Sequence, residues 1–253
     1  GTSTLTNDAG KSDLRTTDRL ACVLSDIQNM GYEVVLVSSG AIAVGRNKLN
    51  MTAKPDSMRM KQAAAAVGQC SLMYLYDKFF GDYDKTVAQI LLNADDIEEE
   101  EKKENLINTF NALLEMGVIP IVNENDSVSY KEIESEDRLF GDNDMLSAVV
   151  AVLCRAKHLV IFSDIDGFYD HDPRLYPNAQ LIDQIDTIDD SVYALAGGAG
   201  SRRGTGGMRT KLQAASLATS QGTNTIVTNG KRPEVLYDIV KGGRAGTLFP
   251  GKI

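Results

Sequence analysis

Short apolar runs rich in β-branched residues alternate along this chain with longer segments that have the spacing and composition of helices. Strands that alternate with helices of this length pair in parallel, with helices on both faces of the sheet. The sequence therefore predicts an α/β fold with a mainly parallel sheet. The expected strands are residues 34–37, 87–92, 118–122, 159–162, 225–227 and 247–249, and the expected helices are 20–30, 41–44, 58–80, 105–116, 145–154, 208–220 and 234–240.

Three local patterns add detail to this prediction. The run from Val34 to Val37 is apolar throughout, which predicts a strand buried on both faces. The acidic residues 95–101 are expected to open the helix at 105–116, because negative charge stabilises a helix N-terminus. Residues 127–140 are polar and carry charges of both signs, which favours an excursion or a lid over a core element.

Composition excludes several classes of protein. With 253 residues, 43% of them hydrophobic, the chain can bury a sizeable core. Its formal net charge of −9 gives it no basic surface for general nucleic-acid binding. Cys22, Cys70 and Cys154 are far apart, which argues against a disulfide framework or a zinc site and fits a reducing cytoplasm, and Cys70 and Cys154 are expected in the core. No apolar run approaches the ~20 residues of a membrane-spanning helix, so we expect a cytoplasmic protein without nucleic-acid or membrane partners.

Polar residues follow several of the predicted strands. Ser38-Ser39-Gly40, Asn123-Glu124-Asn125-Asp126 and Ser163-Asp164 come directly after strands, and Gly141-Asp142-Asn143-Asp144 opens a helix. Ligands of parallel sheets bind beyond the carboxyl ends of the strands. Each motif alone also fits a turn or a helix cap, but together they favour a binding site.

A glycine-rich segment predicts a phosphate site of an uncommon kind. The chain has no Walker A loop and no dinucleotide fingerprint. Residues 204–211, Gly-Thr-Gly-Gly-Met-Arg-Thr-Lys, run into a predicted helix with a lysine one turn inside. Free N–H groups, glycines and a cation at a helix start suit a polyphosphate. A second such segment, Gly1-Thr2-Ser3, stands where a first strand would have ended.

The candidate site has acids, amides, glycines and lysine, but no evident base or nucleophile. The two histidines, His158 and His171, stand beside no serine or cysteine nucleophile. This set suits phosphoryl transfer, in which positioning and charge neutralisation do most of the catalysis. A carboxylate acceptor fits best, because with a pKa near ~4.3 it is ionised without a general base. Lysines, Mg²⁺ and backbone N–H groups would then relieve its repulsion with the phosphate.

At this point the chain resembles the glutamate 5-kinases of the amino acid kinase superfamily. The resemblance extends over essentially the whole chain, and its motifs are specific in combination. They are Gly1-Thr2-Ser3, VSSGAIAVG (37–45), AAVGQ (65–69), VNENDSV (122–128), GDNDMLSA (141–148), SDIDGFYDHDPR (163–174) and GTGGMRTK (204–211).

The resemblance implies a three-layer α/β/α sandwich around a mainly parallel, open sheet. It implies one amino acid kinase domain, residues 1–253, whose N-terminal lobe binds glutamate and whose C-terminal lobe, from about residue 155, binds ATP. Many bacterial members carry a further C-terminal RNA-binding-like domain, and as a departure from them this sequence is expected to contain no such domain. The implied reaction moves the γ-phosphate of ATP, with Mg²⁺, to the side-chain carboxylate of L-glutamate, the first step of proline biosynthesis. Family members also suggest a homo-oligomer, a dimer or tetramer, and feedback inhibition by proline.

Site residues follow by matching motifs. Glutamate would be held by Ser39, Asp126 and Asn143, with Asn123 and Asp142 nearby; Asp126 suits the α-amino group and Asn143 the α-carboxylate. Lys211 would neutralise the transferring phosphate, and Asp144 would orient lysines. No residue is assigned as a metal ligand. The nucleotide would be bound by Gly1, Thr2, Ser3, Ser163, Asp164, Thr205, Gly206, Gly207, Met208, Arg209, Thr210 and Lys211.

Two departures and two alternatives accompany this reading. The family has a lysine two residues before the Gly1-Thr2-Ser3 turn, a position outside this sequence, and Ser163 replaces a common threonine but keeps the hydroxyl. One alternative is a related kinase for N-acetylglutamate, carbamate or UMP. An acidic residue such as Asp126 argues against N-acetylglutamate, which lacks a free α-amino group. The other alternative is a non-catalytic regulatory module of the same fold.

Overall fold

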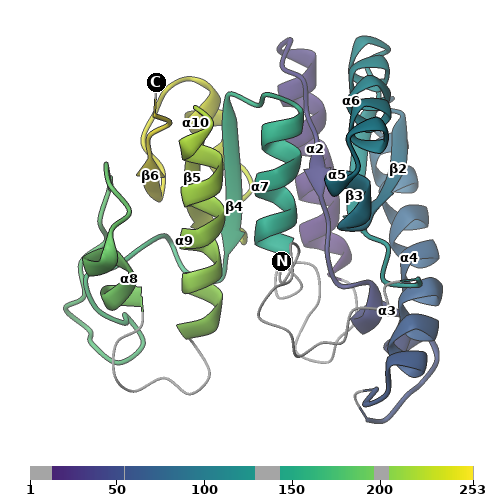
Figure 1. Ribbon diagram of the computed structural model, residues 1–253, viewed down its shortest axis with the longest axis horizontal. Helices are drawn as coiled ribbons and strands as arrows, with labels where there is room; N and C mark the ends of the chain where they lie inside the picture. Colours follow the sequence, from purple (N-terminus) through teal and green to yellow (C-terminus); the bar gives the residue numbers. More distant parts are fainter. Residues whose placement is uncertain (1–12, 54, 129–142, 197–204, 253) are drawn as a thin grey trace. The chain divides into compact units, whose positions relative to one another are not determined.

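The computed structural model describes residues 13–252, apart from 54, 129–142 and 197–204 (Figure 1). The chain divides into two compact units, residues 1–143 and 144–253, and each is described by itself. The stretch 127–140, expected as an excursion or lid, lies mostly outside the described residues. Among the described helices, none is long and apolar enough to cross a membrane.

The first unit contains a three-stranded parallel sheet of order β1-β3-β2. Leu36 pairs with Ile121, and Val87 pairs with Ile119. The carboxyl ends of β1 and β3 therefore lie together, at Val37 and Glu124. The elements in chain order are α2 (Leu14–Asn29), β1 (Leu36–Val37), α3 (Ala41–Lys48), α4 (Met58–Gly81), β2 (Val87–Leu92), α5 (Asp95–Glu98), α6 (Glu100–Glu115) and β3 (Ile119–Glu124).

Helix α2 shows how local sequence sets the bounds of an element. The Asp13 carboxylate accepts hydrogen bonds from the Thr16 N–H at 3.1 Å and the Thr16 hydroxyl at 2.8 Å, and so caps the N-terminus. These bonds lower the pKa of Asp13, the backbone bond most of all. The helix buries a stripe at helical spacing and stops before Gly31, whose φ of +92° suits glycine. The stripe is Leu20, Val23, Leu24 and Ile27.

Helices α3 and α4 cross in direct backbone contact at two glycines. A Cβ on Gly45 would lie 1.7 Å from the Ala64 carbonyl oxygen, and one on Gly68 would lie 1.8 Å from the Ala41 carbonyl oxygen. Both distances are far below any real contact. The glycines of the GAIAVG and AAVGQ motifs are therefore packing residues, and they fix α3 against α4.

The second unit has a mixed sheet, in which β4 pairs with β5 in parallel and β5 pairs with β6 in antiparallel fashion. Figure 1 shows α9 lying along β5, and its Leu212, Ala214, Ala215 and Ala218 are completely buried. Between β4 and α8, Gly167 packs against Thr247 of β6. The elements are α7 (Asn143–Leu153), β4 (His158–Ser163), α8 (Asp190–Ala196), α9 (Thr205–Ser220), β5 (Asn224–Asn229), α10 (Val235–Val240) and β6 (Thr247–Phe249).

The predicted α/β fold with mostly parallel strands is confirmed, with three local corrections. Residues 35–37 are only partly buried, and within the described residues β1 pairs with one neighbouring strand, β3. Cys70 is exposed on α4 and Cys154 is half-buried, so their expected place in the core was wrong. The acidic run forms a separate helix, α5, and only Glu100 and Glu101 stand in the first turn of α6. Helices α5 and α8 were not predicted.

Candidate functional site

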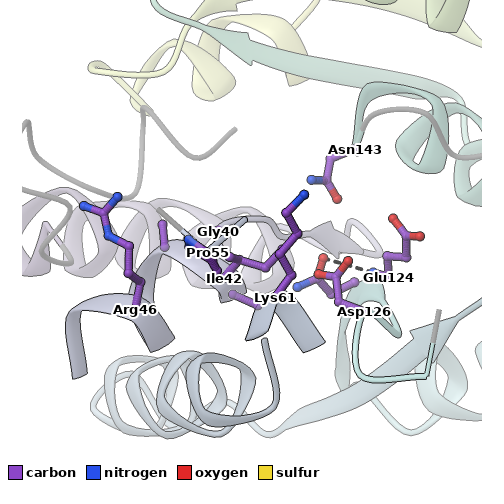
Figure 2. A pocket seen from close by; sticks show the side chains of 11 residues that line it. Gly40, Ile42, Arg46, Pro55, Lys61, Glu124, Asp126 and Asn143 are labelled. Carbon is purple, nitrogen blue, oxygen red and sulfur yellow. Dashed lines mark hydrogen bonds between the residues drawn. The ribbon is translucent and has the colours of Figure 1, made fainter. Parts of the chain in front are cut away.

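A cavity of about 350 Å³ lies in the first unit, at the carboxyl ends of β1 and β3. Its volume is within the range of small-molecule sites. Figure 2 shows side chains from α3, α4 and the end of β3 around it. The lining residues are Gly40, Ala41, Ile42, Ala43, Arg46, Pro55, Lys61, Asn123, Glu124, Asp126 and Asn143.

One wall of the cavity is an acid and amide cluster that follows β3. Asn123 is 2% exposed; its amide N–H donates to Gln69 Oε1 at 2.9 Å, and its Oδ1 accepts from the Glu124 N–H at 3.0 Å. The Asn125 N–H donates to the Leu92 carbonyl oxygen at 2.9 Å and ties the following turn to β2. Asp126 stands in that turn. Backbone and side-chain bonds thus hold this carboxylate at the sheet edge.

The opposite wall is the start of α3, where the chain leaves β1. Gly40 caps this helix with φ +89° and no side-chain hydrogen bond, so the first-turn N–H groups have no cap from that residue. The preceding Ser39 is 3% exposed, and its hydroxyl has no hydrogen-bond partner among the described residues. A buried unpartnered hydroxyl beside a cavity suits contact with a polar ligand.

Ser38 is anchored differently from Ser39. Its hydroxyl shares a 2.8 Å hydrogen bond with the Tyr76 hydroxyl, and the Ser38 N–H donates to the Val122 carbonyl oxygen at 2.8 Å. Burial raises the pKa of Tyr76 to about 12, an effect that the Ser38 bond partly offsets. This contact fixes the end of β1 against α4, so Ser38 has a structural role.

Two cations line the same cavity, and no sequence pattern selects either of them. Arg46 lies one turn into α3, and Lys61 lies in the first turns of α4; both are half-buried. The signal that could have found them is the lack of an acidic residue three or four positions away on either helix. A cation without such a partner on a helix beside a glycine motif is a candidate ligand-binding residue.

The second unit contains a mostly buried ion pair between two of the residues predicted from sequence. Lys211 Nζ lies 2.8 Å from Asp144 Oδ2, and the two side chains are 14% and 12% exposed. The Thr210 hydroxyl donates to the same oxygen at 3.3 Å. Asp144 comes from the first turn of α7 and Lys211 from the second turn of α9. The pair places a lysine charge one turn inside a helix N-terminus.

The carboxyl ends of β4 and β5 carry a second polar group of side chains in this unit. Ser163 ends β4, and its hydroxyl donates to Asp164 Oδ1 at 3.3 Å. Asp164 also accepts from Arg174 Nη2 at 2.9 Å. Asn229 pairs with Ser163 across the two strands, and its amide donates to Asp166 Oδ1 at 2.9 Å. Arg174 and Asn229 are additions to the residues predicted from sequence.

The two histidines, His158 and His171, occupy different environments in the second unit. Burial lowers the pKa of His158 at the start of β4, which keeps this ring neutral. His171 is exposed and lies beside Asp170, with 3.3 Å between Nδ1 and Oδ1. This contact of His171 is with a carboxylate.

The structure brings the predicted residues together in three groups. Asn123, Asp126 and Asn143 line the cavity, and Ser39 precedes its residue Gly40. Asp144, Thr210 and Lys211 are in contact, as are Ser163 and Asp164. Residues Thr205, Gly206, Gly207, Met208 and Arg209 form the start of α9, whereas Gly1, Thr2, Ser3 and Asp142 lie outside the described residues.

Comparison with known proteins identifies the family. The model of the amino acid kinase family matches residues 1–229. The chain belongs to the amino acid kinase family. It is 54% identical over 252 residues to a glutamate 5-kinase of Clostridium perfringens, with 100% of this chain and 93% of the relative covered. It is 50% identical to a glutamate 5-kinase of Listeria innocua, with 100% and 91% covered. The resemblance seen in the sequence motifs is thereby confirmed.

Solved structures of this amino acid kinase fold are more distant in sequence. An isopentenyl phosphate kinase of T. acidophilum superposes with a TM-score of 0.66 at 18% identity, covering 98% of this chain and 97% of its own. A carbamate kinase from Giardia lamblia, bound to AMP-PNP, superposes with a TM-score of 0.66 at 16% identity, covering 99% and 96%. Identities this low establish the fold only.

Proposed function

We propose that this protein is a glutamate 5-kinase, which transfers the γ-phosphate of ATP to the side-chain carboxylate of L-glutamate. The observation that carries the proposal is the 54% identity to a glutamate 5-kinase over the full chain. In this reaction a γ-carboxylate oxygen attacks the γ-phosphorus, and the bond from phosphorus to the β–γ bridging oxygen breaks. The products are L-glutamyl 5-phosphate and ADP. The activity is the first step of proline biosynthesis.

The chemistry requires charge neutralisation more than proton transfer. The acceptor carboxylate is already ionised at neutral pH, so the absence of a suitably placed histidine among the described residues is no obstacle. Two anions must instead approach each other. Oriented N–H groups and lysine charge lower the cost of that approach, which is the usual means of catalysis in phosphoryl transfer.

Glutamate is proposed to bind in the cavity of the first unit. Asp126 would accept from the α-ammonium group, and Asn143 would donate to the α-carboxylate. Ser39 would donate its unpartnered hydroxyl, with Asn123 and Asp142 completing the site. Support comes from the shared cavity of Asn123, Asp126 and Asn143, from its volume of about 350 Å³, and from the buried Ser39 hydroxyl.

ATP is proposed to bind the second unit as its magnesium complex. Lys211, oriented by Asp144, would neutralise the transferring phosphate, and residues 205–211 at the start of α9 would contact the polyphosphate. Ser163 and Asp164 would lie at the nucleotide, together with Gly1, Thr2 and Ser3. Among the described residues no three His, Cys, Asp or Glu side chains form a metal cluster. Mg²⁺ is commonly held by substrate phosphates and one or two carboxylates, so the ion would arrive with ATP.

Three further properties are proposed with the activity. A cytoplasmic location is supported by the free thiols of Cys22, Cys70 and Cys154. A homodimer or homotetramer is proposed by analogy with other family members. Feedback inhibition by proline is supported by the α-amino and α-carboxyl groups that proline shares with glutamate. Light scattering and a proline titration of the activity test the last two.

An ADP-release assay across four acceptors tests the function. We expect ADP release with L-glutamate and little with N-acetylglutamate, aspartate or UMP, because Asp126 requires a free α-ammonium group and the cavity suits the longer side chain. Preference for N-acetylglutamate or UMP would assign the chain to a different kinase of the family. No turnover of any acceptor by the wild-type protein would favour a regulatory module.

A further inference from the structure

The cavity of the first unit contains more positive charge than its assigned residues use. Arg46 and Lys61 both line it. Within the described part of the chain, neither side chain makes a hydrogen bond or an ion pair. No acidic residue lies three or four positions from Arg46 or from Lys61 in the sequence. Half-buried cations that form no ion pair with the protein favour contact with an anionic ligand.

The positions of the charged groups in glutamate restrict which carboxylate each cation of the cavity can contact. Its ammonium and α-carboxylate are attached to the same carbon, whereas the γ-carboxylate is three bonds further along the side chain. If Asp126 binds the ammonium, the partner of the α-carboxylate must lie close to Asp126. Asn143 supplies a neutral amide there, but a charged partner contributes a stronger hydrogen bond.

Figure 2 shows that the two cations lie in different parts of the cavity. Arg46 lies at one end of the cavity, and the carboxyl groups of Glu124 and Asp126 lie at the other. The Lys61 side chain extends between them, with its ammonium group on the side of Asn143. Lys61 is therefore the cation on the side of the proposed ammonium-binding residue.

We propose that Lys61 is a specificity-determining residue that forms an ion pair with the α-carboxylate of the substrate amino acid. The proposal rests on the proposed function and names a recognition residue for it. Because the α-carboxylate is remote from the reacting atoms, the ion pair is present equally in the ground state and the transition state. Its loss therefore raises KM and changes kcat little.

The test compares two acceptors that differ only at the α-carboxyl group. L-isoglutamine keeps the ammonium and the γ-carboxylate of L-glutamate but carries a neutral α-amide. For Lys61→Met we expect kcat/KM for glutamate to fall by about 10- to 100-fold, the range for losing a charged hydrogen bond. The value for isoglutamine should hardly change. Lys61→Arg keeps the charge and should keep most of the preference for glutamate.

Arg46→Gln is the matched control, because it removes a cation from the other end of the same cavity. It should change kcat/KM for glutamate and isoglutamine in the same proportion. Calorimetric titration of glutamate without ATP gives a second readout, in which Lys61→Met alone should abolish the preference for glutamate over isoglutamine. Circular dichroism and thermal unfolding check that each variant is folded, and Lys61→Gln replaces Lys61→Met if the latter is not.

The outcomes separate this inference from the proposed function. A wild-type protein that does not phosphorylate glutamate overturns the function and the inference together. A wild-type protein that does so, with equal losses for the two acceptors in Lys61→Met, overturns the role of Lys61 alone. A loss in Arg46→Gln that affects glutamate more than isoglutamine would assign the α-carboxylate to Arg46. This result would also overturn the role of Lys61.

Discussion

At the scale of single residues, the contact between Lys211 and Asp144 affects both stability and charge placement. The pair is mostly buried, with 2.8 Å between Nζ and Oδ2. Replacing both charges by neutral groups can cost little, whereas removing one partner leaves an uncompensated charge, at a cost of ~3–5 kcal/mol. Stability and catalysis can therefore be separated by the choice of variants.

Lys211→Met should lower both the stability of the protein and its turnover. We expect the free energy of unfolding to fall by about 3 kcal/mol, because Asp144 keeps its charge without its partner. Turnover should fall by ~10²–10³, the range for removing one group that stabilises transition-state charge. Denaturant unfolding followed by circular dichroism measures the first effect, and ADP release measures the second.

The control is the double variant Lys211→Met with Asp144→Asn. It should recover most of the lost stability, since no isolated charge remains, while turnover stays low. Recovery of turnover with stability would reject the role of Lys211 at the phosphate and leave it a structural residue.

Tyr76 gives a stability effect that depends on pH. Burial raises its pKa to about 12 from 10.0. The folded protein therefore keeps this proton where the unfolded chain loses it, so the stabilisation is complete below pH 10 and disappears as pH rises towards 12. A shift of this size corresponds to roughly 3 kcal/mol. Unfolding free energies of wild type and Tyr76→Phe, measured from pH 8 to 11, should differ in slope above pH 10, with wild type the steeper; parallel curves would contradict this.

Single residues also show what the sequence could predict about the site. The place of Asn123 and Asp126 at the cavity was predictable, because polar side chains at the carboxyl ends of parallel strands lie where ligands bind. Asn143 opens a helix, and it was selected by the resemblance of its motif. Arg46 and Lys61 were not, because neither belongs to a local motif. Their common cavity depends on how α3 crosses α4, which is a tertiary contact.

At the scale of elements, that crossing depends on Gly45 and Gly68, where no side chain fits between the helix backbones. The crossing also positions Gln69, which holds Asn123, and the first turn of α3, which lines the cavity. The close packing of α3 against α4 therefore also positions residues of the candidate site. Gly45 and Gly68 of the sequence motifs therefore act as helix-packing residues in the fold.

Gly68→Ala should destabilise the protein and weaken glutamate binding together. The added methyl would overlap the Ala41 carbonyl, and overpacking of this kind costs about 1–3 kcal/mol or more. Gly81→Ala is the matched control on the same helix, because nothing lies within 4 Å of its added Cβ; alanine there should be neutral or slightly stabilising. Thermal unfolding and glutamate titration measure both variants, and equal behaviour of the two would refute the close crossing.

Apolar runs predicted the bounds of two strands, whereas two short helices were not predicted. The bounds of β2 and β6 agree with those predicted from the apolar runs 87–92 and 247–249. Helices α5 and α8 are only four and seven residues long, too short for a hydrophobic period to appear. Strand β1 is also shorter than predicted: of residues 34–37, only Leu36 and Val37 pair with β3 in the described structure.

At the scale of the whole molecule, the two units carry different proposed ligands, so each ligand should stabilise the protein independently. A ligand at 100 times its Kd adds about 2.7 kcal/mol to the stability of the unit that binds it. Asp126→Asn should therefore lose the thermal shift caused by glutamate and keep the shift caused by MgADP. Lys211→Met should keep the glutamate shift and lose part of the nucleotide shift. Thermal unfolding of wild type and both variants with each ligand provides the measurement, and a reversed pattern would mean that the two ligands are assigned to the wrong units.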